Sequence, residues 1–227
     1  RIKDSALLAA APMIVPSSVL GLNGKTPPSE RIVLGGIGLG PRGRQVLNSF
    51  LPNADCQFVM IADAQSERAE IVKRIVDRKY GNNDCTKSQD MGDVLSRDDI
   101  DGVIIATGDR WHTTASIYAA RAGKDIYCEK PCSMNIQEAI ELDEEVKKHK
   151  RVFQAGTQRR NVPNFAKAVE IARSGKIGKL TAVHAGIQKL REYKQPLPEQ
   201  PLPPKEVCDW DKWVGPAPMV PYNKEYT

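Results

Sequence analysis

The fold of this chain is decided by one stretch, Arg31-Ile32-Val33-Leu34-Gly35-Gly36-Ile37-Gly38-Leu39-Gly40-Pro41-Arg42-Gly43. Its first half is a short apolar strand, and its second half follows the pattern Gly-x-Gly-x-x-Gly just before a helical segment. Asp63 ends the next apolar run, about 20 residues after the last glycine. Glycines at such a turn bring backbone N–H groups and the positive end of a helix against a pyrophosphate. We therefore expect a dinucleotide to bind at Gly38, Leu39, Gly40, Pro41, Arg42 and Gly43, with Asp63 on its adenosine ribose.

The acidic residue also bears on the choice of dinucleotide. Asp63 would accept hydrogen bonds from a ribose and repel a 2′-phosphate, which favours NAD over NADP. Arg42 would add a charge-assisted contact to the pyrophosphate. The alternative is an ordinary strand-to-helix turn followed by a surface aspartate.

Strands alternate with helices along most of the chain. Apolar runs predict strands over 31–37, 56–62, 102–106, 125–128 and 152–155. Amphipathic segments predict helices over 44–51, 66–79 and 113–122, and another that begins at Asn135 with Glu138 three residues later, as in a capping box. This alternation is typical of an α/β fold with a doubly wound parallel sheet, here a Rossmann domain over residues 30–156.

The pattern changes near residue 157. A helix over 164–174 and an alternating strand over 180–188 are expected, followed by a proline-rich arm that should not form regular structure. Residues 157–227 are therefore expected to begin a second, α+β domain that is incomplete in this chain.

The first 29 residues are expected to be the remnant of an export signal and a linker. Residues 5–15 are apolar and rich in small side chains, too short to span a bilayer, and break at Pro16. Their composition favours an exported, periplasmic protein; an amphipathic first helix and a cytoplasmic location are the alternatives. No transmembrane span is expected.

Composition excludes several classes of protein. The chain has 227 residues and a net charge of +5, and its Lys and Arg residues are spread along it, which argues against a nucleic-acid partner. Five cysteines, an odd number in a chain of this size, argue against a disulfide scaffold. Cys128 and Cys132 lack a second Cys/His pair at zinc-binding spacing, so no metal site is expected and the thiols should be free.

Three further polar clusters follow predicted strands, where ligands bind in open α/β sheets. They are Ala106 to His112, Cys128 to Cys132, and Gly156 to Arg160. In the second cluster, Lys130 could orient a hydroxyl group or move its proton. A surface ion pair with Glu129 is the equally weighted alternative for Lys130.

The four clusters, in this order, resemble the Gfo/Idh/MocA family of oxidoreductases. The family shows a glycine loop, an acidic residue at the end of the second strand, an "atP-x-x-x-H" segment, an "EKP" motif and a "G-x-q-x-R" strand end; residues 209–218 also resemble the "DWdlWlGPaP" segment of a branch whose members often carry export signals. The resemblance implies hydride transfer between a nicotinamide and a carbon of a sugar or polyol, and homo-oligomers formed through the sheet of the second domain. It implies that Lys130 is catalytic, and that the cofactor also contacts Thr107, Asp109, Trp111, His112, Glu129, Lys130 and Gln158.

This chain departs from the family pattern at two positions. Gly108 stands where the family usually has proline, and Arg110 where the branch often has histidine. Arg110 should keep a cation near the cofactor without shuttling protons at neutral pH. Trp111 should pack beside the nicotinamide half, at the domain interface or in the core, and His184 is interpreted as structural.

The sequence thus predicts an NAD(P)-dependent dehydrogenase that acts on a sugar, glycoside or polyol, with NADP the less favoured cofactor. Two alternatives remain open. One is a redox-neutral NAD-dependent glycosidase, which oxidises a sugar carbon, eliminates the glycosidic bond and returns the hydride. The other is a non-catalytic nucleotide-binding protein.

Overall fold

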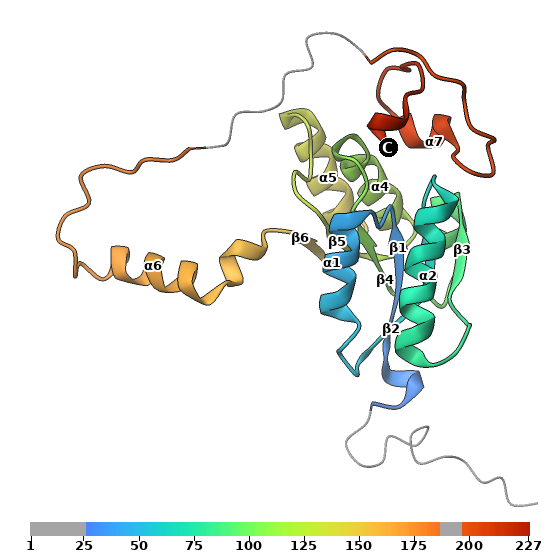
Figure 1. Cartoon of the computed structure of the whole chain (residues 1–227). Helices are drawn as coiled ribbons and strands as arrows, with labels where there is room; N and C mark the ends of the chain where they lie inside the picture. Colours follow the sequence, from blue (N-terminus) through green and yellow to red (C-terminus); the bar gives the residue numbers. More distant parts are fainter. Residues whose placement is uncertain (1–25, 187–196) are drawn as a thin grey trace, which may run out of the picture.

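A computed structural model describes residues 26–186 and 197–227 (Figure 1). Its strands are β1 (Ile32–Ile37), β2 (Cys56–Ala62), β3 (Thr86–Ser88), β4 (Gly102–Ile105), β5 (Asp125–Cys128) and β6 (Phe153–Ala155). Its α-helices are α1 (Pro41–Phe50), α2 (Ser66–Tyr80), α3 (Met91–Leu95), α4 (Asp109–Arg121), α5 (Ile136–Lys148), α6 (Pro163–Arg173) and α7 (Trp210–Val214). Short 3₁₀ turns occupy Pro28–Glu30, Gln158–Asn161 and Lys224–Tyr226.

The six strands form one parallel sheet in the order β3-β2-β1-β4-β5-β6. This is the Rossmann order, in which the two halves of the sheet diverge from the central β1 and β4. β4 is buried throughout, as expected for a strand covered on both faces. The predicted doubly wound parallel sheet is therefore confirmed.

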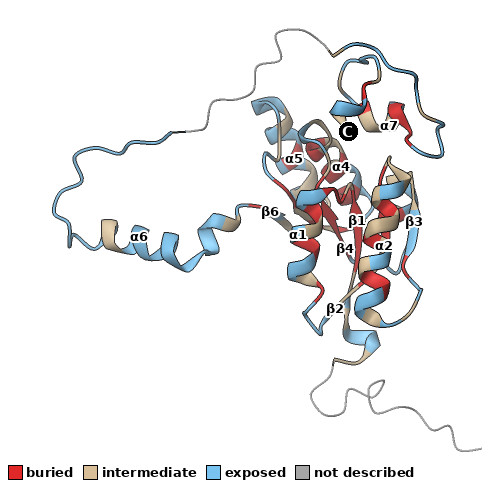
Figure 2. Ribbon diagram, viewed as in Figure 1, coloured by how far each residue is buried: buried red, intermediate tan, exposed pale blue. Residues whose placement is uncertain are grey.

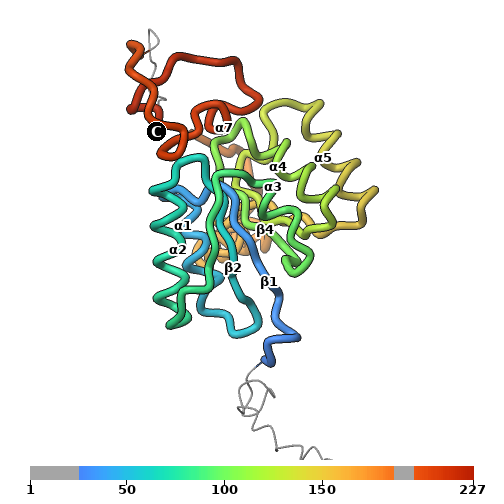
Figure 3. Tube along the Cα trace, turned by 90° about the vertical axis from the view of Figure 1, so that its right-hand side faces the viewer, coloured from blue at the N-terminus to red at the C-terminus, as the bar shows by residue number. Residues whose placement is uncertain are grey.

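Helices cover both faces of the sheet. Figure 3 shows α1 and α2 on one side of the strands and α3, α4 and α5 on the other. Leu47 of α1 and Val72 of α2 pack against Ile104 in one core, and Ala115 and Ala119 of α4 pack against Ile105 in the other. All of these side chains are almost inaccessible to solvent.

Helix ends follow their local sequence. Asn135 caps α5, because its side chain accepts a hydrogen bond from the Glu138 backbone at 2.9 Å while Glu138 Oε1 accepts one from Asn135 Nδ2 at 2.9 Å. Pro41 is the first residue of α1, where the missing N–H costs no helical hydrogen bond. The glycine turn is thereby joined directly to the start of a helix.

The predicted helix near 164–174 is present as α6, but it stands away from the sheet and is exposed over most of its length (Figures 1 and 2). The predicted strand over 180–188 is wrong for residues 180–186, which have no regular structure; residues 187 and 188 lie outside the described part. A strand needs a neighbour to satisfy its backbone hydrogen bonds, and no described segment pairs with this one.

The expectation that the proline-rich arm forms no regular structure holds for residues 197–204 but is wrong for Trp210–Val214, which form α7. Residues 205–227, here called the strap, contain α7 and fold onto the carboxyl edge of the sheet. Ser66 N donates to Val207 O at 3.1 Å, and Asp209 N donates to Ala64 O at 2.9 Å. Trp210 stacks on Trp213 with ring centroids 4.5 Å apart, in a small core that belongs to the strap itself. Prolines around α7 therefore bound the helix without preventing packing.

Candidate functional site

A cavity of about 600 Å³ opens at the carboxyl edge of the sheet, under the strap. Its walls come from the ends of β1, β2 and β4, from the segment after β3, and from the strap. The lining residues are Ile37, Gly38, Gly40, Pro41, Arg42, Ala62, Asp63, Ala64, Arg68, Gln89, Asp90, Met91, Ala106, Thr107, Gly108, Arg110, Trp111, Lys212, Trp213 and Tyr226. The cavity lies at the point where the strand order diverges, which is where open α/β sheets bind ligands.

The glycine turn forms one wall of this cavity. Gly38 adopts φ +66°, and a Cβ at this position would lie 2.4 Å from Thr107 Cγ2. Leu39 and Gly43 are buried beneath the turn, where Leu39 packs into the core. Gly38, Gly40, Pro41 and Arg42 line the cavity, while Leu39 and Gly43 support the turn from behind. A backbone cradle that a side chain would fill, at the start of a helix, fits a pyrophosphate.

Asp63 lies at the end of β2, facing the same cavity with only 8% of its surface exposed. Its carboxylate accepts a hydrogen bond from Gln65 N at 2.9 Å. Burial raises the pKa of Asp63 to about 6, and the Gln65 bond together with the charges of Arg68 and Arg44 only partly offsets this. Among the described residues, only Oδ1 of this buried carboxylate accepts a hydrogen bond. The carboxylate therefore fits the hydroxyl groups of a ribose, which would supply further donors.

Glu129 pairs with Arg42 rather than with its neighbour Lys130. Arg42 Nη2 and Nε lie 3.0 and 3.1 Å from Glu129 Oε1. Gln158 Nε2 donates to the same oxygen and lies 2.7 Å from the Tyr127 hydroxyl. The alternative of an ion pair between Lys130 and Glu129 is therefore wrong. Glu129 belongs to an Arg42–Glu129–Gln158 cluster, and the Lys130 side chain is exposed. Glu129 and Gln158 lie behind Arg42 and do not line the cavity.

His112 is buried in α4 and also lies outside the cavity lining. Its Nδ1 lies 2.6 Å from the carbonyl oxygen of Pro131 and must donate to it, because a carbonyl only accepts. Nε2 is then an acceptor, and it has no partner among the described residues. His112 therefore holds the turn that carries Lys130, which includes a cis Lys130–Pro131 bond.

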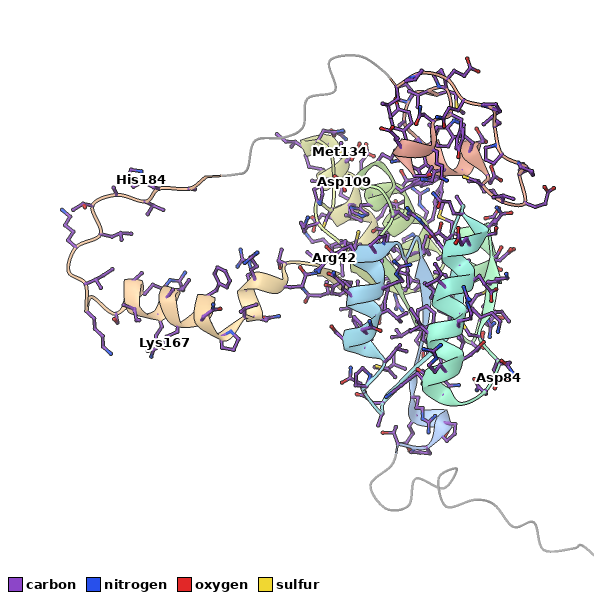
Figure 4. All side chains as sticks on the ribbon, viewed as in Figure 1. Arg42, Asp84, Asp109, Met134, Lys167 and His184 are labelled. Carbon is purple, nitrogen blue, oxygen red and sulfur yellow. The ribbon has the colours of Figure 1, made fainter. Side chains whose placement is uncertain are left out.

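The start of α4 divides its predicted residues between two environments. Thr107 and Trp111 line the cavity, whereas Asp109 is exposed beside it (Figure 4). His184 lies on an extended segment well away from this edge (Figure 4).

The strap supplies lining residues that the sequence reasoning missed, namely Lys212, Trp213 and Tyr226. The guanidinium carbon of Arg110 lies 4.1 Å from the centroid of the Trp213 ring, and Arg110 Nε donates to Val214 O at 2.7 Å. Arg110 thus lines the cavity, with its charge engaged by the strap. The two closely spaced tryptophans in residues 209–218 were the sequence feature that could have indicated a segment packed over this cavity.

Two more contacts fix the strap in place. Trp111 Nε1 donates to Lys212 O at 2.9 Å, which settles the packing of Trp111 against α7. Lys212 Nζ lies 2.6 Å from Asp90 Oδ2, and this bond lowers the pKa of Asp90 and raises the pKa of Lys212. The strap is thereby attached to both halves of the sheet edge.

The cysteines carry no disulfide; Cys85, Cys128 and Cys208 are buried, and Cys56 and Cys132 are partly exposed. Within residues 26–186 and 197–227, no three His, Cys, Asp or Glu side chains are grouped to hold a metal ion. Over the same residues, no helix has the length and apolar character needed to cross a membrane.

Residues 31–157 match the profile of the family described as "Oxidoreductase family, NAD-binding Rossmann fold" (GFO_IDH_MocA). The chain is 30% identical over 146 residues to myo-inositol 2-dehydrogenase of Thermotoga maritima, a match that covers 64% of this chain and 42% of the relative. It is 34% identical over 137 residues to glycosyl hydrolase family 109 protein 5 of Phocaeicola vulgatus, covering 58% of this chain and 26% of the relative. The crystal structure of myo-inositol 2-dehydrogenase from Lactobacillus plantarum superposes with a TM-score of 0.59 at 26% identity, over 66% of this chain and 43% of that one.

The chain thus spans less than half the length of these curated relatives. More than half of it matches the family profile, and that match contains the glycine turn, Asp63 and the Glu129-Lys130-Pro131 motif. The chain therefore belongs to the Gfo/Idh/MocA family of oxidoreductases and carries the family's NAD-binding Rossmann domain.

Proposed function

We propose that this chain binds NAD(H) in the cavity under the strap and takes part in hydride transfer to or from a carbon of a sugar, glycoside or polyol. The observation that carries the proposal is the meeting of the glycine turn and the buried Asp63 in one cavity of about 600 Å³. When bound, the nicotinamide supplies the hydride chemistry. Asp63 favours NAD over NADP, because a 2′-phosphate would meet its carboxylate.

Each residue has a role set by its position. Backbone N–H groups at Gly38–Gly43 and the side chain of Arg42 hold the pyrophosphate, and Asp63 accepts hydrogen bonds from the adenosine ribose. Thr107 and Trp111 line the nicotinamide half. Lys130 orients the substrate hydroxyl and moves its proton, while Glu129, His112 and Gln158 position the turns that carry these groups. Asp109 lies exposed at the start of α4.

The substrate pocket would be completed by a second domain that begins in residues 157–227. The exposed α6 is consistent with a helix that packs against such a domain, since Phe165 and Val169 are 42% and 50% exposed on it. Homo-oligomers through the sheet of that domain belong to the same proposal. We further propose that residues 5–15 act as an export signal, with a cytoplasmic location as the alternative. Fusion to a phosphatase that is active only in the periplasm, with and without this segment, tests the proposal through phosphatase activity.

The redox-neutral glycosidase is the second candidate, and the strap favours it. Lys212, Trp213 and Tyr226 line the cavity from the strap. Such a cover would slow the exchange of a bound dinucleotide, and a cofactor that recycles its own hydride does not need to exchange. The similarity to a glycosyl hydrolase family 109 protein points in the same direction. A non-catalytic nucleotide-binding protein is the remaining alternative.

One experiment separates the three functions. The protein in its full length is purified without added cofactor, assayed for co-purifying NAD, and incubated with inositols, free sugars and aryl glycosides. Net NADH formation from free polyols or sugars supports the dehydrogenase, and glycoside cleavage without net NADH supports the glycosidase. Bound NAD with neither reaction supports the non-catalytic protein.

The role of Lys130 is tested in the same assay. Lys130→Ala should lower turnover by roughly 100-fold, within the usual range for a positioned proton-transfer group. Lys167→Ala is the matched control, because Lys167 is an exposed lysine on α6, away from the cavity (Figure 4). Undiminished turnover of Lys130→Ala would overturn the catalytic assignment.

A further inference from the structure

Two thiols flank the turn that carries Lys130. Cys128 ends β5 with no exposed surface, and Cys132 is partly exposed four residues later. Cys128 Sγ lies 3.4 Å from the carbonyl oxygen of Glu129, and Cys132 Sγ lies 3.8 Å from that same oxygen. Both sulfurs therefore converge on one side of the Glu129-Lys130-Pro131 turn.

We propose that Cys128 and Cys132 form a reversible disulfide in reaction with a hydroperoxide, and that this modification switches off the Lys130 turn. The inference rests on the proposed function only for its effect on turnover; the modification itself does not depend on it. No role for these thiols follows from the cofactor site, because neither lines the cavity.

The two thiols are unequal in a way that suits the reaction. The adjacent Cys128 thiol lowers the pKa of Cys132, whereas the Cys132 thiol and burial raise the pKa of Cys128. The more exposed sulfur is therefore the one with more thiolate character, and the thiolate is the nucleophile. Cys132 is the attacking residue and Cys128 the resolving one.

The chemistry balances in two steps. The Cys132 thiolate attacks a hydrogen peroxide oxygen, the O–O bond breaks, and hydroxide leaves to be protonated to water, so that the sulfur is oxidised to a sulfenic acid. The Cys128 thiol then passes its proton to the sulfenic hydroxyl as its sulfur attacks the Cys132 sulfur; the S–O bond breaks, the S–S bond forms, and a second water leaves. Two thiols and one peroxide thus give one disulfide and two waters.

Closing the disulfide must change the turn between the two cysteines. An S–S bond is about 2.05 Å long, so at least one sulfur must leave its present position against the Glu129 carbonyl. The turn is now held by His112 Nδ1 on Pro131 O at 2.6 Å and by Thr113 Oγ1, which donates to Cys132 O at 3.0 Å. These contacts and the direction of Lys130 shift together, while the glycine turn is left unchanged. Oxidation should therefore lower turnover by about 100-fold, the cost of a misplacement near 1 Å, and leave NADH binding intact.

The test is peptide mapping of the full-length protein after hydrogen peroxide treatment and alkylation of the remaining thiols. We expect a Cys128–Cys132 cross-link that dithiothreitol reverses, and the same cross-link in Cys56→Ser, the matched control with a partly exposed thiol elsewhere. Cys132→Ser should form no cross-link and should keep its turnover in peroxide. The cross-link should also form in Lys130→Ala, so its appearance is judged without any catalytic activity.

Two results would overturn the inference. One is oxidation of Cys132 to sulfinic acid while the Cys128 thiol stays reduced and is therefore alkylated. The other is a cross-link that forms in a protein active before peroxide treatment and leaves its turnover unchanged. A protein that forms the cross-link but shows no hydride transfer in any state would instead count against the proposed function alone.

Discussion

Replacing Asp63 with asparagine should stabilise the protein and weaken its cofactor site at the same time. Burial raises the pKa of Asp63 from 3.8 to about 6, so the folded chain holds the charged carboxylate less favourably than the unfolded chain does. Each tenfold change in proton affinity corresponds to about 1.4 kcal/mol, which makes the penalty roughly 3 kcal/mol above pH 6. Asparagine keeps an oxygen for the N–H of Gln65 and removes the charge.

The sign of the pH dependence follows from the raised pKa. Between about pH 4 and pH 6 the folded wild-type chain binds more protons than the unfolded chain, so its unfolding free energy falls as pH rises through this window. Asp63→Asn lacks this loss. The free energy of unfolding of Asp63→Asn should exceed that of the wild type most at pH 7.5, by as much as roughly 3 kcal/mol. This difference should almost disappear at pH 4.

Urea unfolding at both pH values, followed by tryptophan fluorescence, measures this difference. Asp84→Asn serves as the control, because Asp84 is an exposed carboxylate far from the cavity (Figure 4), and it should change stability by less than about 0.5 kcal/mol. NADH affinity of Asp63→Asn should fall by about tenfold or more, because a hydrogen bond to a charged acceptor is lost. An equal gain at both pH values, or a loss of stability at pH 7.5, would refute the reasoning.

Three other substitutions test the walls of the cavity. Gly38→Ala should cost about 1–3 kcal/mol of stability and abolish measurable NADH binding, because a Cβ at φ +66° would lie 2.4 Å from Thr107 Cγ2; thermal unfolding and NADH titration measure both effects. Arg42→Ala should destabilise the protein by about 2 kcal/mol in urea unfolding, because it leaves the buried Glu129 carboxylate without its cation and held only by Gln158; a change below about 1 kcal/mol would contradict this. Trp213→Ala should raise the rate of NADH dissociation in stopped-flow fluorescence while leaving the unfolding of the Rossmann core unchanged, since the tryptophan lines the cavity from the strap.

The central fold could be predicted because its signals are local. The apolar run of β2 was placed correctly at Cys56–Ala62, and the helix after it differs by one residue from the predicted 66–79. β3 and α3 were missed because Thr86–Ser88 is short and polar and Met91–Leu95 is only five residues long, too few for a periodic pattern.

Contacts between distant residues could not be predicted in the same way. The glycine turn and Asp63 meet in the cavity as expected, because parallel strands bring their carboxyl ends to one edge. The partner of Glu129 is Arg42, 87 residues away, and the nearer Lys130 gave a misleading choice of partner. The spacing of residues in the sequence shows which of them lie at the same edge of the sheet. It does not show which of their side chains form ion pairs or hydrogen bonds with one another.

The strap shows why this limit bears on function. The strap is held at the sheet edge by Arg110, Trp111 and Asp90, which are far from it in sequence. Each of these three residues also lines the cavity. Substitution of any of these three side chains would therefore alter the cavity wall that a dinucleotide would contact as well as the strap. Arginine at position 110, where the resembling branch often has histidine, is explained by this geometry, because its planar cation both stacks on Trp213 and donates to the Val214 carbonyl. The departure from the family pattern is thus part of how the strap is held over the cavity.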